Sequence, residues 1–225
     1  MILCKQCKVR EFGPFNTLTN QELEKVHQNK ISYTFEKGDV LFEEGNALNG
    51  MFCVRSGVCK LMKLSDNGRH QIVKLVSSGD TVGQRSLVSD ERTNLKAIAL
   101  NSVEACFIPK AKILSWLKTN PNLAFGLLRC LAKDLKSADD NIVKMAQKSV
   151  AHRLARLLLF IEAQFGVTDE GFLKLKLSRD DYASLIGTTT ETTIRTLSYF
   201  KKEGLLQVSG KNIKITKPQQ LHFLE

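Results

Sequence analysis

The chain has 225 residues, 43% of them hydrophobic and 25% charged, a composition typical of a globular protein with a substantial core. The formal net charge of +10 is consistent with a polyanionic partner. No run of about 18 apolar residues exists, and the N-terminal segment MILCKQCK is too short and too polar for a secretory signal. We therefore expect a cytoplasmic location and no membrane partner.

Six cysteines in a chain without an export signal predict free thiols rather than disulfides. Cys4 and Cys7 form a single CxxC motif, which supplies too few ligands for a four-ligand metal or cluster site. Cys53, Cys59 and Cys106 lie in apolar, strand-like runs and are predicted to be core residues. The sequence therefore predicts no metal site.

A strand-rich region follows a short helix. Thr19 and Glu22 form a capping-box pattern that predicts a helix over Asn20–Asn29. From Ile31 to Ile108, runs of Val, Ile, Phe and Leu are separated by glycine and Asn/Asp turns, which favours an all-β barrel or sandwich. Residues 51–54 and 57–64 are predicted to be neighbouring strands, and 71–76 to follow across an Asn67-Gly68 turn.

A long helix is predicted after a short one. Residues 110–117 form the short helix, and Pro121 suits the first turn of the next. Apolar residues then recur at alternating spacings of 4 and 3: Ala124, Leu128, Leu131, Leu135, Ala138, Ile142 and Met145. This heptad pattern predicts a dimerisation helix. The alternative is a stripe packed on the barrel of the same subunit.

The C-terminal part predicts a helix-turn-helix. An amphipathic helix over residues 149–165 precedes it. Ser178 can cap the first helix of the motif, Gly187 permits the turn, and a Thr188–Glu191 capping box introduces a second helix from about Thr190 to Lys201. Ile194, Leu197 and Phe200 are predicted to face inward.

A hairpin is predicted next to this motif. Residues 206–209 and 212–216 alternate in type around Gly210-Lys211, and residues 172–177 alternate as well and could pair with them. Together they predict a winged helix-turn-helix whose second helix enters the DNA major groove. Arg195 has the planar fork that pairs with guanine, and the lysines suit phosphates. The predicted DNA contacts are Thr189, Thr190, Glu191, Arg195, Lys201 and Lys202.

The chain resembles the Crp/Fnr family of bacterial regulators over nearly its whole length. The matching motifs are Lys37-Gly38-Asp39-x-x-Phe42-x-x-Gly45, Val54-x-x-Gly57, Gly79-Asp80-x-x-Gly83 and Thr192-x-x-Arg195 after Glu191. The resemblance implies an α+β chain with an N-terminal double-stranded β-helix or jelly-roll barrel, a long dimerisation helix and a winged helix-turn-helix. We place the sensor domain at 1–118, the dimerisation helix at 119–147 and the DNA-binding domain at 148–225.

The same resemblance implies a homodimer that binds a palindromic DNA site and contacts RNA polymerase. Glu191 and Arg195 would read bases. The position before Glu191 is often Arg in the family and is Thr190 here, so the preferred DNA sequence is expected to differ.

Family members that bind cyclic AMP share a short cassette, which this chain matches only in part. Gly83 matches its glycine, but Gln84 replaces the glutamate for the ribose, and Thr93 and Asn94 stand where an Arg-Ser pair would hold the cyclic phosphate. Arg92 is one residue early and Arg85 lies in the loop, so a substitute after a register shift stays open. Cyclic AMP is not expected, because the missing guanidinium and carboxylate remove the charge-assisted bonds that would hold it.

The oxygen-sensing branch of the family holds an iron–sulfur cluster on an N-terminal cysteine group plus one internal cysteine. Cys4, Cys7 and one of Cys53, Cys59 or Cys106 leave the set one ligand short, so a cluster is not expected. None of the four histidines stands in a motif, so haem is not expected either. Another small-molecule effector, or none, stays open.

The rival interpretation is a protein that binds cyclic nucleotides or other small molecules and does not read DNA. An enzyme is not expected. The sequence shows no nucleophile triad or paired carboxylates at a usable spacing, and no phosphate-binding loop.

Overall fold

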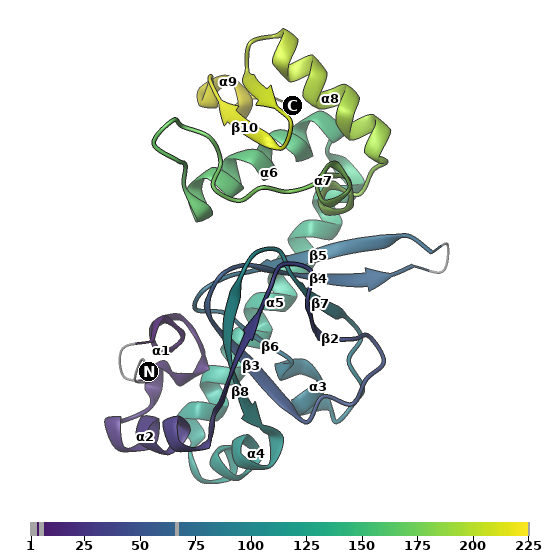
Figure 1. Cartoon of the computed structure of the whole chain (residues 1–225). Helices are drawn as coiled ribbons and strands as arrows, with labels where there is room; N and C mark the ends of the chain where they lie inside the picture. Colours follow the sequence, from purple (N-terminus) through teal and green to yellow (C-terminus); the bar gives the residue numbers. More distant parts are fainter. Residues whose placement is uncertain (1–3, 5–6, 66–67, 225) are drawn as a thin grey trace. The chain divides into compact units, whose positions relative to one another are not determined.

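The computed structural model of the chain describes residues 4, 7–65 and 68–224. The chain divides into two units, Met1–Ala138 and Asp139–Glu225 (Figure 1). Helix α5, Pro121–Gln147, contributes residues to both units. Within the described residues, none of the helices combines the length and the apolar composition that a bilayer crossing requires.

Three short elements begin the first unit: α1 (Lys8–Phe12), the 3-10 helix η2 (Pro14–Thr17) and α2 (Asn20–Asn29). The predicted capping box of α2 is confirmed. The Thr19 hydroxyl accepts a hydrogen bond from the Glu22 amide, and the Glu22 carboxylate accepts one from the Thr19 amide at 2.7 Å. Buried side chains from these elements, including Phe15 and Leu23, pack in one core with Cys53 and Cys106 from the strands.

The strands form a roll of two four-stranded antiparallel sheets, which confirms the predicted all-β region. The first sheet has the order β1 (Ile31–Phe35), β8 (Val103–Pro109), β3 (Gly50–Ser56) and β6 (Thr81–Val82). The second has the order β2 (Val40–Phe42), β7 (Lys96–Ala99), β4 (Cys59–Leu64) and β5 (His70–Val76).

One predicted strand neighbourhood is wrong. Residues 51–54 and 57–64 were expected to pair, but β3 and β4 lie in different sheets. Gly57 between them has φ 82°, and a Cβ there would lie 2.2 Å from the Ser102 carbonyl oxygen, so the chain turns from one sheet to the other at a position that only glycine fits. The β4–β5 pair is confirmed, while Asn67 of its predicted turn lies outside the described residues.

Aromatic side chains fill part of the roll interior. The ring of Phe52 lies 4.9 Å from that of Phe107, centroid to centroid, and between 5.9 and 6.4 Å from the rings of Tyr33, Phe35 and Phe42. Aromatic pairs at such distances contribute about 0.5–1.5 kcal/mol beyond the area that they bury. The cluster therefore helps to hold the two sheets together, since Phe42 belongs to the second sheet and Phe52 to the first.

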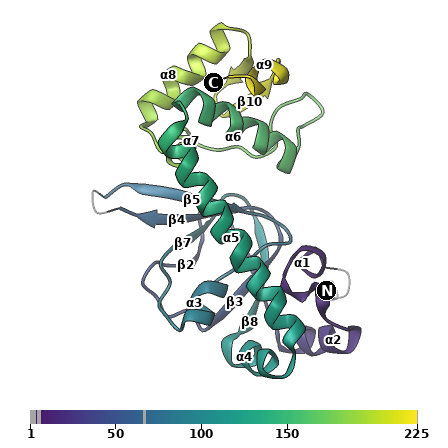
Figure 2. The same cartoon turned by 180° about the vertical axis from the view of Figure 1, so that it is seen from behind.

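Two further helices of the first unit come before α5 in the chain: α3 (Gln84–Ser89), after β6, and α4 (Lys110–Thr119), after β8. Helix α5, seen along its length in Figure 2, has two apolar faces by the burial of its residues. Leu123, Gly126 and Leu127 are buried. The other face is exposed: Leu128 by 55%, Leu135 by 64% and Ile142 by 67%. Of the other predicted seam residues, Leu131 is half-buried and Ala138 is exposed.

The exposure of these residues bears on the two interpretations of the heptad pattern. A stripe packed on the barrel of its own subunit would be buried in the single chain, and Leu128, Leu135 and Ile142 are not. An apolar stripe of this length is unfavourable in water. The pattern therefore favours a partner helix.

The second unit holds the remaining elements: α6 (Val150–Phe165), α7 (Arg179–Ile186), α8 (Thr190–Lys202), β9 (Leu206–Ser209), β10 (Asn212–Ile215) and α9 (Pro218–His222). Strands β9 and β10 form the predicted hairpin. Residues 172–177 were expected to pair with it as a strand, but only the Leu173 amide bonds to it, donating to the Ile213 carbonyl at 2.8 Å. The leucines at 173, 175 and 177 are nevertheless buried. Their alternation with polar residues therefore reflects burial of one side of the segment and not pairing in a β-sheet.

Gly126 provides a test of how closely α5 packs in the first unit. A Cβ at this position would lie 2.5 Å from the Pro14 carbonyl oxygen. We expect Gly126→Ala to lower the free energy of unfolding by about 1–3 kcal/mol, because the backbone of η2 must move. Urea denaturation followed by the fluorescence of Trp116, the single tryptophan, measures this. Ser137→Ala, at an exposed position of the same helix, is the control and should not destabilise the protein.

Candidate nucleic-acid interface and sensor pocket

The start of α7 is fixed by a complete capping box. The Ser178 hydroxyl accepts a hydrogen bond from the Asp181 amide at 3.0 Å, and the Asp181 carboxylate accepts one from the Ser178 amide at 3.0 Å. Gly187 ends the helix in the left-handed region, with φ 63° and ψ 52°, as the turn requires. The cap at Ser178 and the turn at Gly187 are as the sequence predicted, whereas the reciprocal bond to the Asp181 carboxylate was not predicted. Tyr182, which the sequence analysis did not single out, is buried here, and burial raises its pKa.

The start of α8 differs from the prediction. The cap is Thr189, whose hydroxyl accepts from the Thr192 amide at 3.2 Å, so the expected Thr188–Glu191 capping box is wrong. Glu191 pairs instead with Arg195 one turn later, with 2.7 Å between Oε1 and Nη2. The hydroxyl of Thr190 donates to the Asp180 carboxylate of α7, which ties the two helices of the motif together.

The two faces of α8 are clearly divided. Thr193, Leu197 and Phe200 are buried. Ile194 is 47% exposed, so the prediction that it faces inward is wrong. Thr193 faces inward in its place, because Thr193, Leu197 and Phe200 are separated by 4 and 3 residues and so share one side of the helix. Ile194 is rotated about 100° around the helix axis from Thr193. The exposed residues of α8 include Glu191, Arg195, Ser198, Lys201 and Lys202.

The groups on this face are available for binding. The side chains of Glu191 and Arg195 are 77% and 73% exposed, and an ion pair in water at that exposure contributes little to stability. DNA bases can therefore replace it at small cost. Arg179, which the sequence analysis did not single out, donates from Nη2 to the Gly210 carbonyl at 2.7 Å and so connects α7 to the turn of the hairpin.

Within the first unit, the residues of the predicted effector pocket have partners inside the protein. Gly83 has φ 91°, and a Cβ there would lie 2.4 Å from a methyl carbon of Leu48. The buried amide of Gln84 donates at 3.0 Å to the Asp134 carboxylate of α5, while its own oxygen has no partner. Lys74 of β5 binds the other oxygen of Asp134 at 2.5 Å. These contacts connect the roll to α5.

The other members of the predicted pocket do not point to a common space. Arg85 is exposed and lies 3.7 Å from the carboxylate of Glu91. Arg92 donates to the Gly45 carbonyl at 2.9 Å, and the buried Thr93 hydroxyl donates to the Glu43 carbonyl at 2.5 Å. Asn94 is half-buried. The arginines and threonine are thus engaged in loop contacts and not arranged as an anion site.

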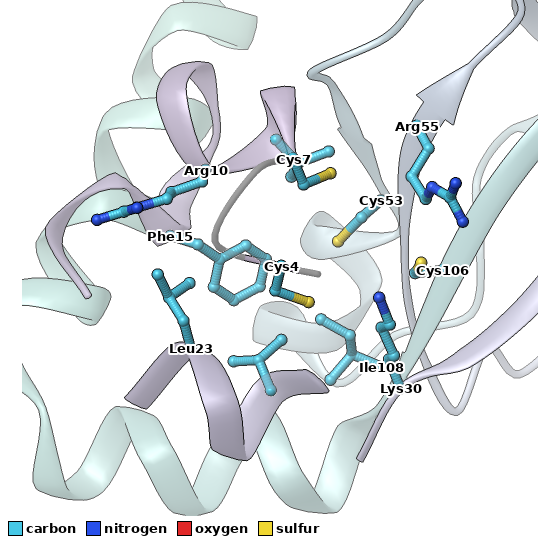
Figure 3. A pocket seen from close by; sticks show the side chains of 12 residues that line it. Cys4, Cys7, Arg10, Phe15, Leu23, Lys30, Cys53, Arg55, Cys106 and Ile108 are labelled. Atoms are coloured by element: carbon cyan, nitrogen blue, oxygen red, sulfur yellow. The ribbon is translucent and has the colours of Figure 1, made fainter. Parts of the chain in front are cut away.

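A different pocket brings four cysteines together. Cys4 and Cys7 from the N-terminal segment, Cys53 from β3 and Cys106 from β8 all line it, and Figure 3 shows their sulfur atoms gathered around one space. Cys53 and Cys106 are directly opposite each other in the β3–β8 ladder. Lys30 and Arg55 also line the pocket.

Two thiols of this pocket, Cys53 and Cys106, are buried, and those of Cys4 and Cys7 are partly buried. Burial raises the pKa of Cys53 well above its ordinary value, and the neighbouring sulfurs of Cys106, Cys7 and Cys4 raise it further. Burial also raises the pKa of Cys4, although Lys30 acts against this. Both thiols are therefore protonated at neutral pH unless a cation or metal replaces the proton.

Comparison with known proteins identifies the family. Residues 33–120 match the cyclic nucleotide-binding domain and residues 152–224 the Crp-like helix-turn-helix domain. The chain is 30% identical over 220 residues to the fumarate and nitrate reduction regulatory protein of Escherichia coli strain K12, across 95% of this chain and 86% of that protein. The chain belongs to the Crp/Fnr family. The protein of the same name from Salmonella typhimurium is 29% identical over 229 residues, covering 99% and 90% of the two chains.

Solved structures agree with this assignment. FixK2 from Bradyrhizobium japonicum has a TM-score of 0.75 and 25% identity, over 86% of this chain and 96% of that one. A Crp/Fnr family regulator from Eubacterium rectale has a TM-score of 0.77 over 92% and 94% of the chains, and at 22% identity it supports the fold alone. The predicted roll, long helix and winged helix-turn-helix are confirmed. This Crp/Fnr member is a DNA-binding transcriptional regulator, and its family consists of regulators rather than enzymes.

The thiol pocket of this Crp/Fnr protein can be tested against the cluster that one branch of the family holds. Within the described residues, no three His, Cys, Asp or Glu side chains are placed to hold a single metal ion together. A cubane cluster makes a different demand, because each of its four cysteines binds a different iron. Only one internal cysteine was expected to join such a set. Two internal cysteines line the pocket, so the ligand number does fit a cluster.

Proposed function

We propose that this regulator binds a two-fold-symmetric DNA site as a homodimer, with α8 of each subunit in the major groove. The observation that carries the proposal is the divided surface of α8. Its buried side holds it in the unit, while Glu191 and Arg195 stand together on its exposed side. Because its ligand is chromosomal DNA, we also propose that it works in the cytoplasm.

Each predicted contact has a distinct role in this proposal. Arg195 pairs its guanidinium fork with guanine O6 and N7, and Glu191 accepts from a cytosine amino group. Lys201 and Lys202, in the last turn of α8, bind phosphates. Thr189 is the N-cap of α8, and its side chain contacts the DNA from the start of that helix. Thr190 acts through its bond to Asp180, which fixes the angle between α7 and α8.

The dimer follows from α5. Its exposed stripe, which includes Leu128, Leu135 and Ile142, pairs with the same stripe of a second subunit in a coiled coil. A two-fold dimer then presents its reading helices about 34 Å apart, one turn of DNA. In this arrangement residues 1–118 receive the signal, 119–147 form the dimer and 148–225 bind DNA. A contact with RNA polymerase completes the proposed activity.

The signal itself, we propose, enters at the thiol pocket rather than at the nucleotide position of the roll. Support comes from the four converging cysteines on one side and from the engaged residues at Gln84, Arg92 and Thr93 on the other. Cys4, Cys7, Cys53 and Cys106 would hold an iron–sulfur cluster, which supplies sensitivity to oxidants when bound. These cysteines would have to lose their protons to serve as ligands.

Substitutions on α8 test the base-reading roles. Arg195→Ala should cost roughly 1–3 kcal/mol of binding free energy and relax specificity at one base pair, whereas Lys202→Ala should weaken binding to all sequences alike. Gel shifts with a selected palindromic duplex and its single-base variants at physiological salt measure both. Equal affinity of the wild-type protein for palindromic and scrambled duplexes would contradict the proposal, and identical behaviour of the two variants would contradict the assigned roles.

A charge in the α5 stripe tests the dimer. Ile142→Glu should shift the protein to a monomer in sedimentation and weaken palindrome binding on the order of a hundredfold, because two linked contacts become one. Ile142 is 67% exposed, so the fold of the single chain should be unaffected. Lys136→Glu, an exposed position outside the stripe, is the matched control and should stay dimeric. A dimeric Ile142→Glu protein would overturn the proposed interface.

The thiol pocket is tested by anaerobic reconstitution with ferrous iron and sulfide. Wild-type protein should bind iron and acid-labile sulfide in equal amounts, about four of each, with the visible absorption of a cluster. Cys53→Ala should lose most of both. Cys59→Ala is the matched control, because Cys59 is also buried but belongs to β4 of the other sheet and does not line the pocket. Equal iron content in the two variants, or none in the wild type, would refute the proposed input.

A further inference from the structure

Ile194 occupies an unexpected position on α8. It follows Glu191 by three residues and immediately precedes Arg195, and it is 47% exposed although isoleucine normally belongs in a core. The buried side of the helix is complete without it, since Thr193, Leu197 and Phe200 supply the inward contacts. The fold of this unit therefore does not account for an isoleucine at this position.

The exposure of Ile194 is notable because of the residues that surround it on α8. Single exposed apolar residues are common and carry no argument by themselves. On the first two turns of α8, however, the other exposed residues are Glu191 and Arg195, both charged. Glu191 and Arg195 address the amino and carbonyl groups of base edges. Ile194 adds the one large exposed apolar side chain of these two turns, and Tyr199, which is 52% exposed, follows on the third turn.

The major groove offers one apolar feature that such a surface can recognise. Thymine carries a 5-methyl group at the groove edge, and the other three bases have no equivalent there. A β-branched side chain in a helix has essentially one χ1 rotamer, so Ile194 loses little side-chain freedom on contact. Burial of a methyl group against it is favourable because both surfaces leave water.

We propose that Ile194 is a specificity-determining residue that contacts the 5-methyl group of a thymine in each half-site. The inference rests on the proposed function, because it needs α8 in the major groove. It adds an apolar contact to the polar reading by Glu191 and Arg195. The operator should accordingly contain a thymine beside the base pair that Arg195 reads.

The experiment removes the methyl group and leaves the base pair intact. Wild-type protein first selects duplexes from a random-sequence library, and each thymine of the selected site is then replaced by uracil in both half-sites. At one symmetric position uracil should weaken wild-type binding about tenfold, which corresponds to about threefold per methyl contact. The ratio of the uracil to the thymine Kd is the readout.

Three variants test whether Ile194 is the residue that senses the thymine methyl group. For Ile194→Ala the Kd ratio at that position should fall to about 1, while Ile194→Val, which keeps a branched apolar side chain, should retain most of it. Lys202→Ala should bind both duplexes more weakly with the ratio unchanged, since a phosphate contact does not sense the methyl group. Because Ile194 is exposed, all variants should unfold like the wild type, which thermal denaturation checks.

The outcomes separate the inference from the function on which it rests. Failure of the wild-type protein to enrich any duplex would overturn the proposed function and this inference with it. Enrichment of a palindrome in which no thymine-to-uracil change affects binding would overturn the inference alone. So would a ratio that stays the same in Ile194→Ala, because the methyl group would then be sensed by another residue.

Discussion

The two apolar faces of α5 are the constraint on which the rest of the structure depends. One face is buried in the first unit, where the absence of a side chain at Gly126 allows the helix backbone to approach Pro14. The other face carries Leu128, Leu135 and Ile142 into solvent. In the proposed dimer, the same face of a second copy would cover it. The proposed symmetric DNA site needs that copy as well, because one α8 would contact only half of the site.

Local signals in the sequence predicted the local structure well. The capping boxes at Thr19 and Ser178 and the left-handed turn at Gly187 follow from residues within one helical turn of each other. The same rules failed at the start of α8, where three threonines stand in a row and each can cap a helix. Leu197 and Phe200 of α8 are buried as predicted, but Thr193 completes the inward set in place of Ile194, which is exposed. Tertiary packing determines which residues of α8 face inward, and helix propensity contains no information about that packing.

Long-range pairing was beyond sequence reasoning for the same reason. Alternation showed that residues 51–54 and 57–64 are strands, but not that Gly57 sends them into different sheets. The thiol pocket depends on that topology, because pairing of β3 with β8 sets Cys53 opposite Cys106. Each cysteine looked like an ordinary core residue in its own strand. Only the ladder, together with the N-terminal segment that brings Cys4 and Cys7, turns them into one cluster.

The contact between Gln84 and Asp134 explains why the ribose-binding carboxylate of the cyclic AMP-binding relatives has no place here. The Gln84 amide donates to Asp134 at 3.0 Å, so a glutamate at this position would set two carboxylates against each other. Lys74 already neutralises one of them and cannot serve both equally. The residue that would hold a nucleotide in such a relative instead joins α3 to α5 directly. Gln84 of α3 and Lys74 of β5 thus both connect the roll to α5 through Asp134.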